Sequence, residues 1–342
     1  MKPRNLVFVA LLWMGLVLPP MTLAHSLTAK EILTTFNVAI TGTFTSQADI
    51  EGRIVAGTIF EPNGSPGFYN KPSPIANNST NFQEINAVNI TCGSVTHCRA
   101  NNGASVNWVN SQTGGGDFNS GSGRPSGMLV HNSPLFTMSQ FTVPLNALEA
   151  HLSTLTANRT TTLSFGTLDF KVTPGPNRVA VFDIPVAELQ SATGIMFTGF
   201  SSHDSIIINV TGTKGYSYSQ GTGFFNPPTS CQATQQPCFN NEVIWNFQNA
   251  GTLHLFNWHG SVLAGMANIT GTGAPLEGLL YAATYTGVSG GAEVHDFPYL
   301  GQIPQEEVEI PESSTWTMLI LGLAGLVLVG RRRALCKSGA LA

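Results

Sequence analysis

The sequence predicts an all-β fold of the β-solenoid (β-helix-like) type, with one flanking α-helix and a C-terminal transmembrane helix. Three observations lead to this fold class. Short β-type segments are separated by Gly, Asn and Pro, one leucine stripe has helical spacing, and one apolar run stands near the C-terminus. With 342 residues, the chain has a length at which an all-β solenoid still forms one domain.

The β-type segments either alternate apolar and small polar residues or form short β-branched runs. The segment 205–210, Ser-Ile-Ile-Ile-Asn-Val, is a continuous apolar run, which indicates a strand covered on both faces. No strict repeat is visible, yet short strands with small residues at the corners suit a solenoid whose rungs stack around one core. The predicted strands cover residues 37–44, 161–165, 205–210, 242–247 and 252–255.

One helix is expected to interrupt the strands, over residues 144–155. It places Leu145, Leu148, Leu152 and Leu155 at helical spacing. This apolar stripe predicts that the helix packs along the β core; the alternative is a groove for a partner.

The stretch 101–127 is rich in Gly, Asn and Ser, and we interpret it as a loop or a flexible insertion. Its run of glycines at 114–116 lacks the following helix and the lysine of a phosphate-binding loop. This excludes a nucleotide site of that type.

Charge is scarce and unevenly distributed. Asp, Glu, Lys and Arg make up only 10% of the chain, against about a quarter in ordinary domains. Six of the 15 basic residues lie at the two ends, whereas all 19 acidic residues lie within 31–312, so the central part, residues 25–312, carries 9 basic and 19 acidic residues and a net charge of −10. Nucleic acid is excluded as a partner, because binding it depends on Lys and Arg neutralising phosphates.

Residues 1–24 have the three parts of a secretory signal peptide. Lys2 and Arg4 form a positive first region, an apolar run follows, and Ala24 supplies a small residue at the cleavage position. Cleavage would leave His25 as the new N-terminus. The alternative is a retained anchor, but the apolar run is shorter than the roughly 20 residues that a membrane span needs.

The C-terminal end contains a second hydrophobic segment, over residues 315–330. Arg331, Arg332 and Arg333 follow it directly, and such a basic cluster stays on the cytoplasmic side, so the rest of the chain is expected outside. Sixteen helical residues span about 24 Å, less than the roughly 30 Å of a bilayer core. A helix this short suits a segment that is recognised and then processed.

Pro311, Glu312 and Ser313, the apolar helix and the arginine cluster stand in an order that resembles the PEP-CTERM protein-sorting signal. Ser313 stands where that signal usually has a second proline. The resemblance implies a sorting segment over 311–336 after a linker over 303–313. It also implies an exosortase-type sorting protease as partner, transient membrane anchoring through the helix, and release to the cell surface or extracellular matrix. The alternative is a plain single-pass anchor.

The cysteines are consistent with export. Cys92 and Cys98 are six residues apart, and Cys231 and Cys238 are seven apart, so proximity favours two local disulfides in an oxidising compartment. Cys336 follows the arginines and is expected to be an unpaired cytoplasmic thiol. A metal site is the alternative, although neither pair has the spacing that zinc sites use.

Several short motifs lie between residues 25 and 302, at 37–42, 49–57, 245–247, 260–264, 276–278 and 293–301. Their order resembles that of the choice-of-anchor A family. The resemblance implies an adhesive domain over 25–302 with a right-handed β-solenoid fold.

One polar cluster is a candidate ligand-binding site. Asp49 and Glu51 are two apart on a predicted strand and therefore share a face, as do Glu293 and His295 near the other end of the domain. If the ends of the domain pair, these four side chains meet. They then form a cation or sugar site, or the acidic residues satisfy turn amides and pair with Arg53.

No catalytic, cofactor or metal site is predicted. The chain has neither a G-x-S-x-G nor an H-E-x-x-H motif. His254, His259 and His295 are either metal ligands or hydrogen-bonded structural residues. The candidates for stacking on sugar rings, each with buried packing as the alternative, are Trp108, Phe118, Tyr216, Tyr218 and Trp258.

These observations predict a non-enzymatic, adhesive surface or matrix protein, with exopolysaccharide or another surface ligand as partner. A secreted carbohydrate-active β-solenoid enzyme is the first alternative, because a pair of catalytic carboxylates among 19 acidic residues has no sequence signature. An ice- or crystal-surface-binding protein is the second. It ranks last because regular T-x-T rows on successive rungs are not visible.

Overall fold

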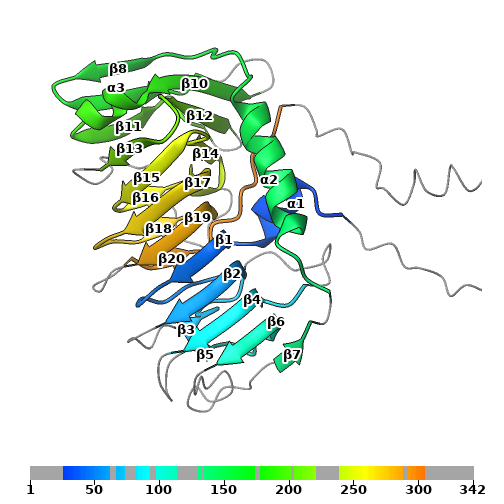
Figure 1. Ribbon diagram of the computed structural model, residues 1–342. Coiled ribbons are helices and arrows are strands. Elements are labelled where there is room, and N and C mark those ends of the chain that lie inside the picture. Colours follow the sequence, from blue (N-terminus) through cyan, green and yellow to red (C-terminus); the bar gives the residue numbers. More distant parts are fainter. Residues whose placement is uncertain are drawn as a thin grey trace, which may run out of the picture.

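The computed structural model describes ten segments of the chain, and every structural statement below refers to them. They are mostly β, with few helices and one large parallel sheet, which is consistent with a β-helix-like fold (Figure 1). The described segments are 26–61, 67–73, 82–92, 98–113, 129–132, 135–173, 178–201, 204–220, 239–287 and 292–304.

The helices and the longer strands have the following bounds. The helices are α1 (Ala29–Thr35), α2 (Ser139–Leu152) and α3 (Val186–Ser191), with a 3₁₀ turn η1 (Phe239–Asn241). The strands of the large sheet are β1 (Val38–Thr45), β2 (Ile54–Glu61), β4 (Ile85–Cys92), β6 (Val106–Thr113), β7 (Leu129–His131), β10 (Val179–Pro185), β12 (Ser205–Thr211), β13 (Tyr216–Ser219), β14 (Val243–Asn246), β15 (Ala250–Leu255), β17 (Ser261–Gly271) and β19 (Leu280–Gly287).

The short strands form three small sheets. β11 (Gly194–Thr198) pairs with β9 (Thr167–Lys171), which pairs with β8 (Thr161–Ser164). The other two sheets consist of β16 (Trp258–His259), β18 (Leu276–Glu277) and β20 (Val294–His295), and of β3 (Gly67–Phe68) with β5 (Arg99–Ala100).

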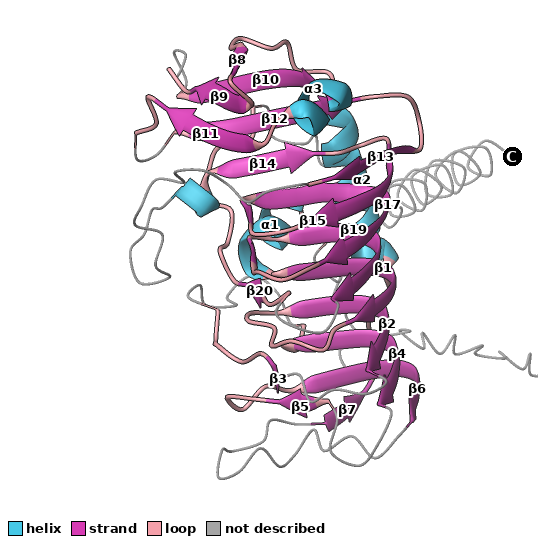
Figure 2. Ribbon diagram, turned by 90° about the vertical axis from the view of Figure 1, so that its left-hand side faces the viewer, coloured by secondary structure: helices cyan, strands magenta, loops and turns pink. Residues whose placement is uncertain are grey.

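The order of strands in the large sheet differs from their order in the chain. It runs β10-β12-β14-β17-β19-β1-β2-β4-β6-β7, and β13 and β15 extend from the second half of β17. The chain therefore starts in the middle of the stack, builds one end, and crosses over with α2. It then builds the other end and returns to pair β19 with β1 (Figures 1 and 2).

The long strands shift register near their middle, which divides their outer surface into two halves. The shifts occur where backbones approach closely: a Cβ on Gly57 would lie 2.4 Å from the carbonyl oxygen of Thr41. The first halves carry buried apolar side chains, among them Val55, Leu263 and Tyr281, which form one cluster with α1 and α2. The helices thus cover only the first half of each strand.

Side chains pointing to the inside of the solenoid form the main core. One of them on each successive long strand is fully or almost fully buried, including Phe44, Ile59, Ile90, Ile269 and Tyr285. The rings of Phe44 and Tyr285 stack with centroids 5.3 Å apart across the junction of β1 and β19. Burial of these stacked side chains is the main source of stability.

Some expectations about the elements are confirmed and others are wrong. The run 206–208 is buried on both sides of β12, as predicted. The predicted helix over 144–155 begins earlier, at Ser139, and ends at Leu152. Leu145, Leu148 and Leu152 are buried as expected, and Leu155 packs partly buried beyond the helix end. Two further short helices, α1 and α3, were not predicted.

The stretch 101–127 was expected to be a loop or a flexible insertion, but part of it forms a strand. Its first part forms β6, which pairs with β4 over residues 106–113, and then β7 pairs with β6. Polar side chains such as Asn110 and Ser111 face outward there, so composition alone concealed a strand that buries only one face.

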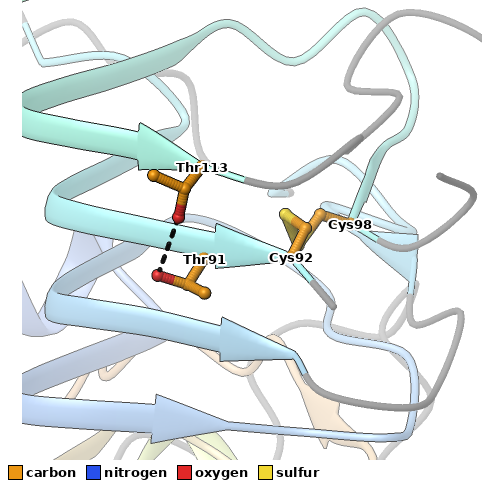
Figure 3. Close-up of a disulfide and its surroundings, with 4 residues drawn as sticks. All are labelled: Thr91, Cys92, Cys98 and Thr113. Atoms are coloured by element: carbon orange, nitrogen blue, oxygen red, sulfur yellow. Dashed lines mark hydrogen bonds between the residues drawn. A yellow bond between two sulfur atoms is a disulfide. The ribbon is translucent and has the colours of Figure 1, made fainter. Parts of the chain in front are cut away.

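Cys92 and Cys98 form a disulfide, as predicted, with their Cα atoms 5.9 Å apart (Figure 3). Both side chains are buried, and the bridge closes the connection between β4 and β5. The other three cysteines, Cys231, Cys238 and Cys336, lie outside the described residues.

Both predicted membrane-related segments also fall outside the described residues. These are the signal peptide with its cleavage position at Ala24 and His25, and the tail with Pro311, Glu312, Ser313 and the arginine cluster. Among the helices that are described, none has the length and apolar character needed to span a bilayer.

The last described residues run along α1 and then toward α2. The Tyr299 N–H donates to the carbonyl oxygen of Leu33 at 3.0 Å, and Lys30 Nζ donates to the carbonyl oxygen of Tyr299 at 3.3 Å. His151 Nε2 lies 2.7 Å from the carbonyl oxygen of Pro304. The beginning and the end of the described chain therefore lie on the helix-covered side (Figure 1).

The packing of α2 gives a first prediction. Leu148→Ala should lower the free energy of unfolding by about 3 kcal/mol, because it leaves a cavity between the helix and the sheet. Val143→Ala is the matched control: its side chain is 60% exposed on the same helix, and it should change the stability by less than about 0.5 kcal/mol. Urea unfolding followed by circular dichroism measures both; equal effects would contradict this role of α2.

Candidate binding surface

The four residues of the predicted polar cluster do come together. Ile50 forms a parallel bridge with Val294 of β20, and the N–H of Glu51 donates to the carbonyl oxygen of Val294 at 2.9 Å. The two ends of the domain therefore pair, and Asp49 and Glu51 lie beside Glu293 and His295.

The contacts of the two N-terminal acidic residues match the structural interpretation. Asp49 accepts hydrogen bonds from the N–H of Gly67 at 2.7 Å and from Asn70 Nδ2 at 2.9 Å. Glu51 accepts one from the N–H of Asp296 at 3.1 Å, and Lys71 Nζ lies 3.7 Å from its Oε2. Both carboxylates satisfy amides of neighbouring loops, and Lys71 is a cation beside Glu51.

Two residues outside the predicted set complete the cluster. Strands β16, β18 and β20 pair in that order, and residues 50 and 51 continue the stack beside β20. The side chains that face away from the core here are His259, Glu277, His295 and Glu51, which we call the His–Glu ladder. His259 Nδ1 lies 3.0 Å from Glu277 Oε2, and His295 Nδ1 lies 3.6 Å from Glu277 Oε1. His295 also contacts Glu293 through Nε2, at 3.0 Å. Basic and acidic side chains thus alternate across four rungs.

A short local repeat is the signal that could have revealed this ladder. The pairs Trp258-His259, Leu276-Glu277 and Val294-His295 each join a buried apolar residue to an ionisable one. Their first residues are 18 positions apart in both steps. The repeat is too brief to stand out in a chain without other periodicity.

Electrostatics favour the charged forms of two ladder residues, Glu277 and His295. Burial opposes ionisation of Glu277, but hydrogen bonds from His259 and His295 outweigh it and lower the pKa of Glu277 to about 2. Burial likewise opposes the charge of His295, but hydrogen bonds to Glu277 and Glu293, with the charge of Glu51, raise its pKa to about 9. At neutral pH both groups are charged and paired.

The contacts of the ladder indicate a structural role. The ladder crosses the junction at which β20 meets the N-terminal residues, and Glu277 contacts both His259 and His295 there. Across the described segments, no group of three or more His, Cys, Asp or Glu side chains is placed to hold a metal ion. We therefore interpret Asp49, Glu51, Glu293 and His295 as part of a structural joint.

The predicted sugar-stacking aromatic residues are mostly in the core. Tyr216, Tyr218 and Trp258 are buried, and the rings of Tyr218 and Trp258 lie 5.9 Å apart, edge to face. Trp108 is partly buried against the core, beside the ring of His131. Phe118 lies outside the described residues.

The second halves of the long strands form a flat polar surface that the sequence reading missed. On seven of the eight strands, two outward side chains flank one buried apolar side chain, and on β6 they flank Gln112; in-register parallel pairing aligns them into two columns. We call these sixteen residues the Thr–Asn–Ser face. The first column is Ser217, Thr252, Asn268, Thr284, Thr43, Thr58, Asn89 and Ser111, and the second is Ser219, His254, Thr270, Thr286, Thr45, Phe60, Thr91 and Thr113.

The T-x-T pattern is not regular over the whole face, as expected, but two neighbouring strands do carry it. Thr43-Phe44-Thr45 on β1 lies next to Thr284-Tyr285-Thr286 on β19, and β2 and β17 carry related rows on either side of this pair. Figure 2 shows these four strands side by side. This pair of rows escaped notice because β1 and β19 are about 240 residues apart in the chain. Asn and Ser also replace Thr at several positions.

Hydrogen bonds along the columns hold the side chains in place. Thr284 Oγ1 donates to Asn268 Oδ1 at 2.7 Å, and Ser111 Oγ donates to Asn89 Oδ1 at 3.0 Å. In the second column Thr113 Oγ1 donates to Thr91 Oγ1 at 3.4 Å, next to the disulfide (Figure 3). The surface is thus a preorganised lattice, with about 4.8 Å between strands and roughly 6.6 Å between the columns.

The face is also uncharged. None of its sixteen positions holds Asp, Glu, Lys or Arg; His254 and Phe60 are the two departures from small polar residues. All sixteen side chains are exposed or half-buried, whereas the buried apolar side chains that pack on α1 and α2 belong to the first halves of the strands.

Comparison with known families agrees with this architecture. A family model with the description "Putative Ice-binding-like adhesive domain" matches residues 29–296, which includes every strand of the described solenoid. No curated protein sequence matches the chain.

The His–Glu ladder gives a second prediction. The folded-state pKa of His295, about 9, lies above its ordinary 6.5, so its stabilising effect is complete below pH 6.5 and is lost as the pH rises through 9. His295→Gln should remove this loss, on the order of 2 kcal/mol after solvent screening. Urea unfolding at pH 6.5 and pH 9 measures it. His254→Gln should keep the wild-type loss, and a variant of His295 that also keeps it would refute the ladder's role.

Proposed function

The chain belongs to the family of ice-binding-like adhesive domains, and from this membership we propose that it is an exported, non-enzymatic protein that adheres through the Thr–Asn–Ser face. An adhesive domain suggests a location at the cell surface or in the extracellular matrix. The observation that carries the proposal is the face itself: two aligned columns of small polar side chains on eight strands, left uncovered by α1 and α2.

Preorganisation of the side chains on the Thr–Asn–Ser face favours adhesion. Side chains that are already fixed by strand pairing and mutual hydrogen bonds lose little conformational freedom when they bind. A flat, periodic array also matches an extended or repeating surface better than it matches a small molecule, which needs a concave site. Such a face suits many weak contacts made at once.

The position of the chain ends supports presentation of this face. The described chain begins and ends beside α1 and α2, through the contacts of Tyr299 with Leu33 and of His151 with Pro304. The Thr–Asn–Ser face lies on the other half of the strands. A tail that holds the protein at a membrane would therefore leave the face accessible.

Export and sorting are part of the same proposal. We propose removal of residues 1–24, attachment through the tail that resembles a PEP-CTERM signal, and processing by an exosortase-type protease. Assignment to the choice-of-anchor A family and the right-handed sense of the solenoid rest on the motifs described above. Exopolysaccharide or another surface component is the proposed partner, and nucleic acid is not.

A carbohydrate-active enzyme remains the alternative function. It would need two carboxylates facing each other across a substrate. In the described segments, Glu51 accepts a hydrogen bond from a backbone amide and Glu277 contacts a histidine, which argues against these two as the catalytic pair.

The face gives a third prediction. Lysine at positions 43, 268 and 284 (Thr43→Lys, Asn268→Lys and Thr284→Lys combined) should weaken binding of the purified protein to the producer's exopolysaccharide at least about tenfold, because it inserts long charged side chains into a flat neutral lattice. Thr156→Lys, which alters an exposed residue between α2 and β8, is the control. Sedimentation with the polymer measures binding.

Two results would count against adhesion through this face. Unchanged binding of the triple variant would place the contact elsewhere on the protein. Release of reducing sugars from the polymer by the wild-type protein would favour the enzymatic alternative.

The tail gives a fourth prediction. Replacing Arg331, Arg332 and Arg333 together by Ala should abolish surface display and leave the precursor unprocessed, because the stop-transfer charge is lost. Cell fractionation and immunoblotting measure both. Lys214→Ala, an exposed change within the domain, is the control, and normal processing of the arginine variant would remove the role proposed for the tail.

A further inference from the structure

One aromatic side chain interrupts the Thr–Asn–Ser face. Phe60 occupies the second column on β2, between Thr45 of β1 and Thr91 of β4. Its side chain is 38% exposed, whereas Ile59, the preceding residue on the same strand, is fully buried and points into the core. A threonine at position 60 would continue the column, so the strand geometry does not require an aromatic residue there.

The surroundings of Phe60 are rich in hydrogen-bonding groups. Thr58 lies two residues before it on the same face, Asn89 is the register partner of Thr58, and Asn89 Nδ2 donates to Thr58 Oγ1 at 3.5 Å. Thr45 and Thr91 flank the ring on either side. An apolar ring is thus surrounded by hydroxyl and amide groups that can both donate and accept hydrogen bonds.

This combination matches the chemistry of a sugar ring. A pyranose presents apolar C–H bonds on its faces and hydroxyl groups around its edge. The C–H bonds carry slight positive charge and are attracted to the negative face of an aromatic ring, while the hydroxyl groups can exchange hydrogen bonds with Thr and Asn. A polymer of sugars repeats these groups along its length, as the face repeats its side chains from strand to strand.

Charge selects among the polysaccharides. The face holds no Asp, Glu, Lys or Arg, and residues 25–302 contain 15 acidic and 9 basic residues. An anionic polymer would therefore meet no compensating cation on the face and would approach a domain of net negative charge. A neutral polymer avoids both costs.

We propose that the Thr–Asn–Ser face binds a neutral polysaccharide, with one sugar ring stacked on Phe60 and its hydroxyl groups bound by Thr45, Thr58, Asn89 and Thr91. This inference rests on the proposed adhesive function and names the ligand class of the same face. It separates the face from one that orders water, for which threonine at position 60 would serve at least as well as phenylalanine.

The test compares Phe60→Thr and Phe60→Ala with the wild-type full-length protein. The probes are four purified polymers: cellulose, chitin and β-1,3-glucan as neutral polysaccharides, and alginate as an anionic one. We expect the wild type to bind at least one neutral polymer more tightly than alginate. Both variants should weaken that binding about tenfold. Leu163→Thr is the matched control, since Leu163 is 41% exposed on β8, in a different sheet, and it should leave binding unchanged.

The variants should remain folded, because position 60 is exposed, and circular dichroism with thermal unfolding checks this. Equal or stronger polymer binding by Phe60→Thr would overturn the proposal, as would binding of alginate alone or of none of the four polymers. Inhibition of ice recrystallisation that is maintained or increased in Phe60→Thr, without polymer binding, would assign the face to ordered water.

The triple lysine variant distinguishes failure of adhesion through the face from failure of sugar stacking on Phe60. Loss of polymer binding in the triple variant together with full binding by Phe60→Thr would leave adhesion through the face intact and would refute the sugar-stacking role of Phe60. Full binding by both would refute the face as the adhesive surface.

Discussion

Parallel, in-register pairing between β1 and β19 joins the first and last parts of the domain. It is supported by the stacked rings of Phe44 and Tyr285 and, on another side of the solenoid, by the bridge between Ile50 and Val294. The columns of the Thr–Asn–Ser face are continuous only because this pairing holds the two halves in register. A slip of one residue would turn the outward threonines into the core, so the surface chemistry depends on the junction.

The sides of the solenoid differ in character because their outward residues differ. One side is apolar and is covered by α1 and α2. Another carries the His–Glu ladder, in which His295 and Glu277 are charged and paired at neutral pH. The third is the Thr–Asn–Ser face, which is uncharged and exposed or half-buried. Ionic groups concentrated at the junction stabilise the fold without disturbing the surface on which a ligand would lie.

Local features of the structure could be predicted from the sequence, whereas features that depend on topology could not. The β-branched run of β12 and the leucine stripe of α2 are visible in short windows, and both elements are found. The disulfide between Cys92 and Cys98 followed from proximity. The meeting of Glu51 with His295 was conditional on pairing of the domain ends, which holds.

Three features could not be predicted from the sequence: the threonine rows, β6 and the role of Phe60. The two T-x-T rows meet at the junction of β1 and β19, which are about 240 residues apart, so no short window contains both. β6 was interpreted as loop because its outward residues are polar and only one face is buried. Phe60 carried no signal by itself; its meaning comes from Thr45 and Thr91, which lie beside it only after folding.

The interleaved strand order has a consequence for how the domain is made. A chain that crosses a membrane from its N-terminus delivers β1, β2, β4 and β6 first, and the free edge of β1 waits for β19, which arrives roughly 240 residues later. Contacts of such long sequence separation form slowly, and an open strand edge invites pairing with other chains. Assembly therefore completes only after nearly the whole domain has emerged, and an unfinished copy is the form most exposed to aggregation.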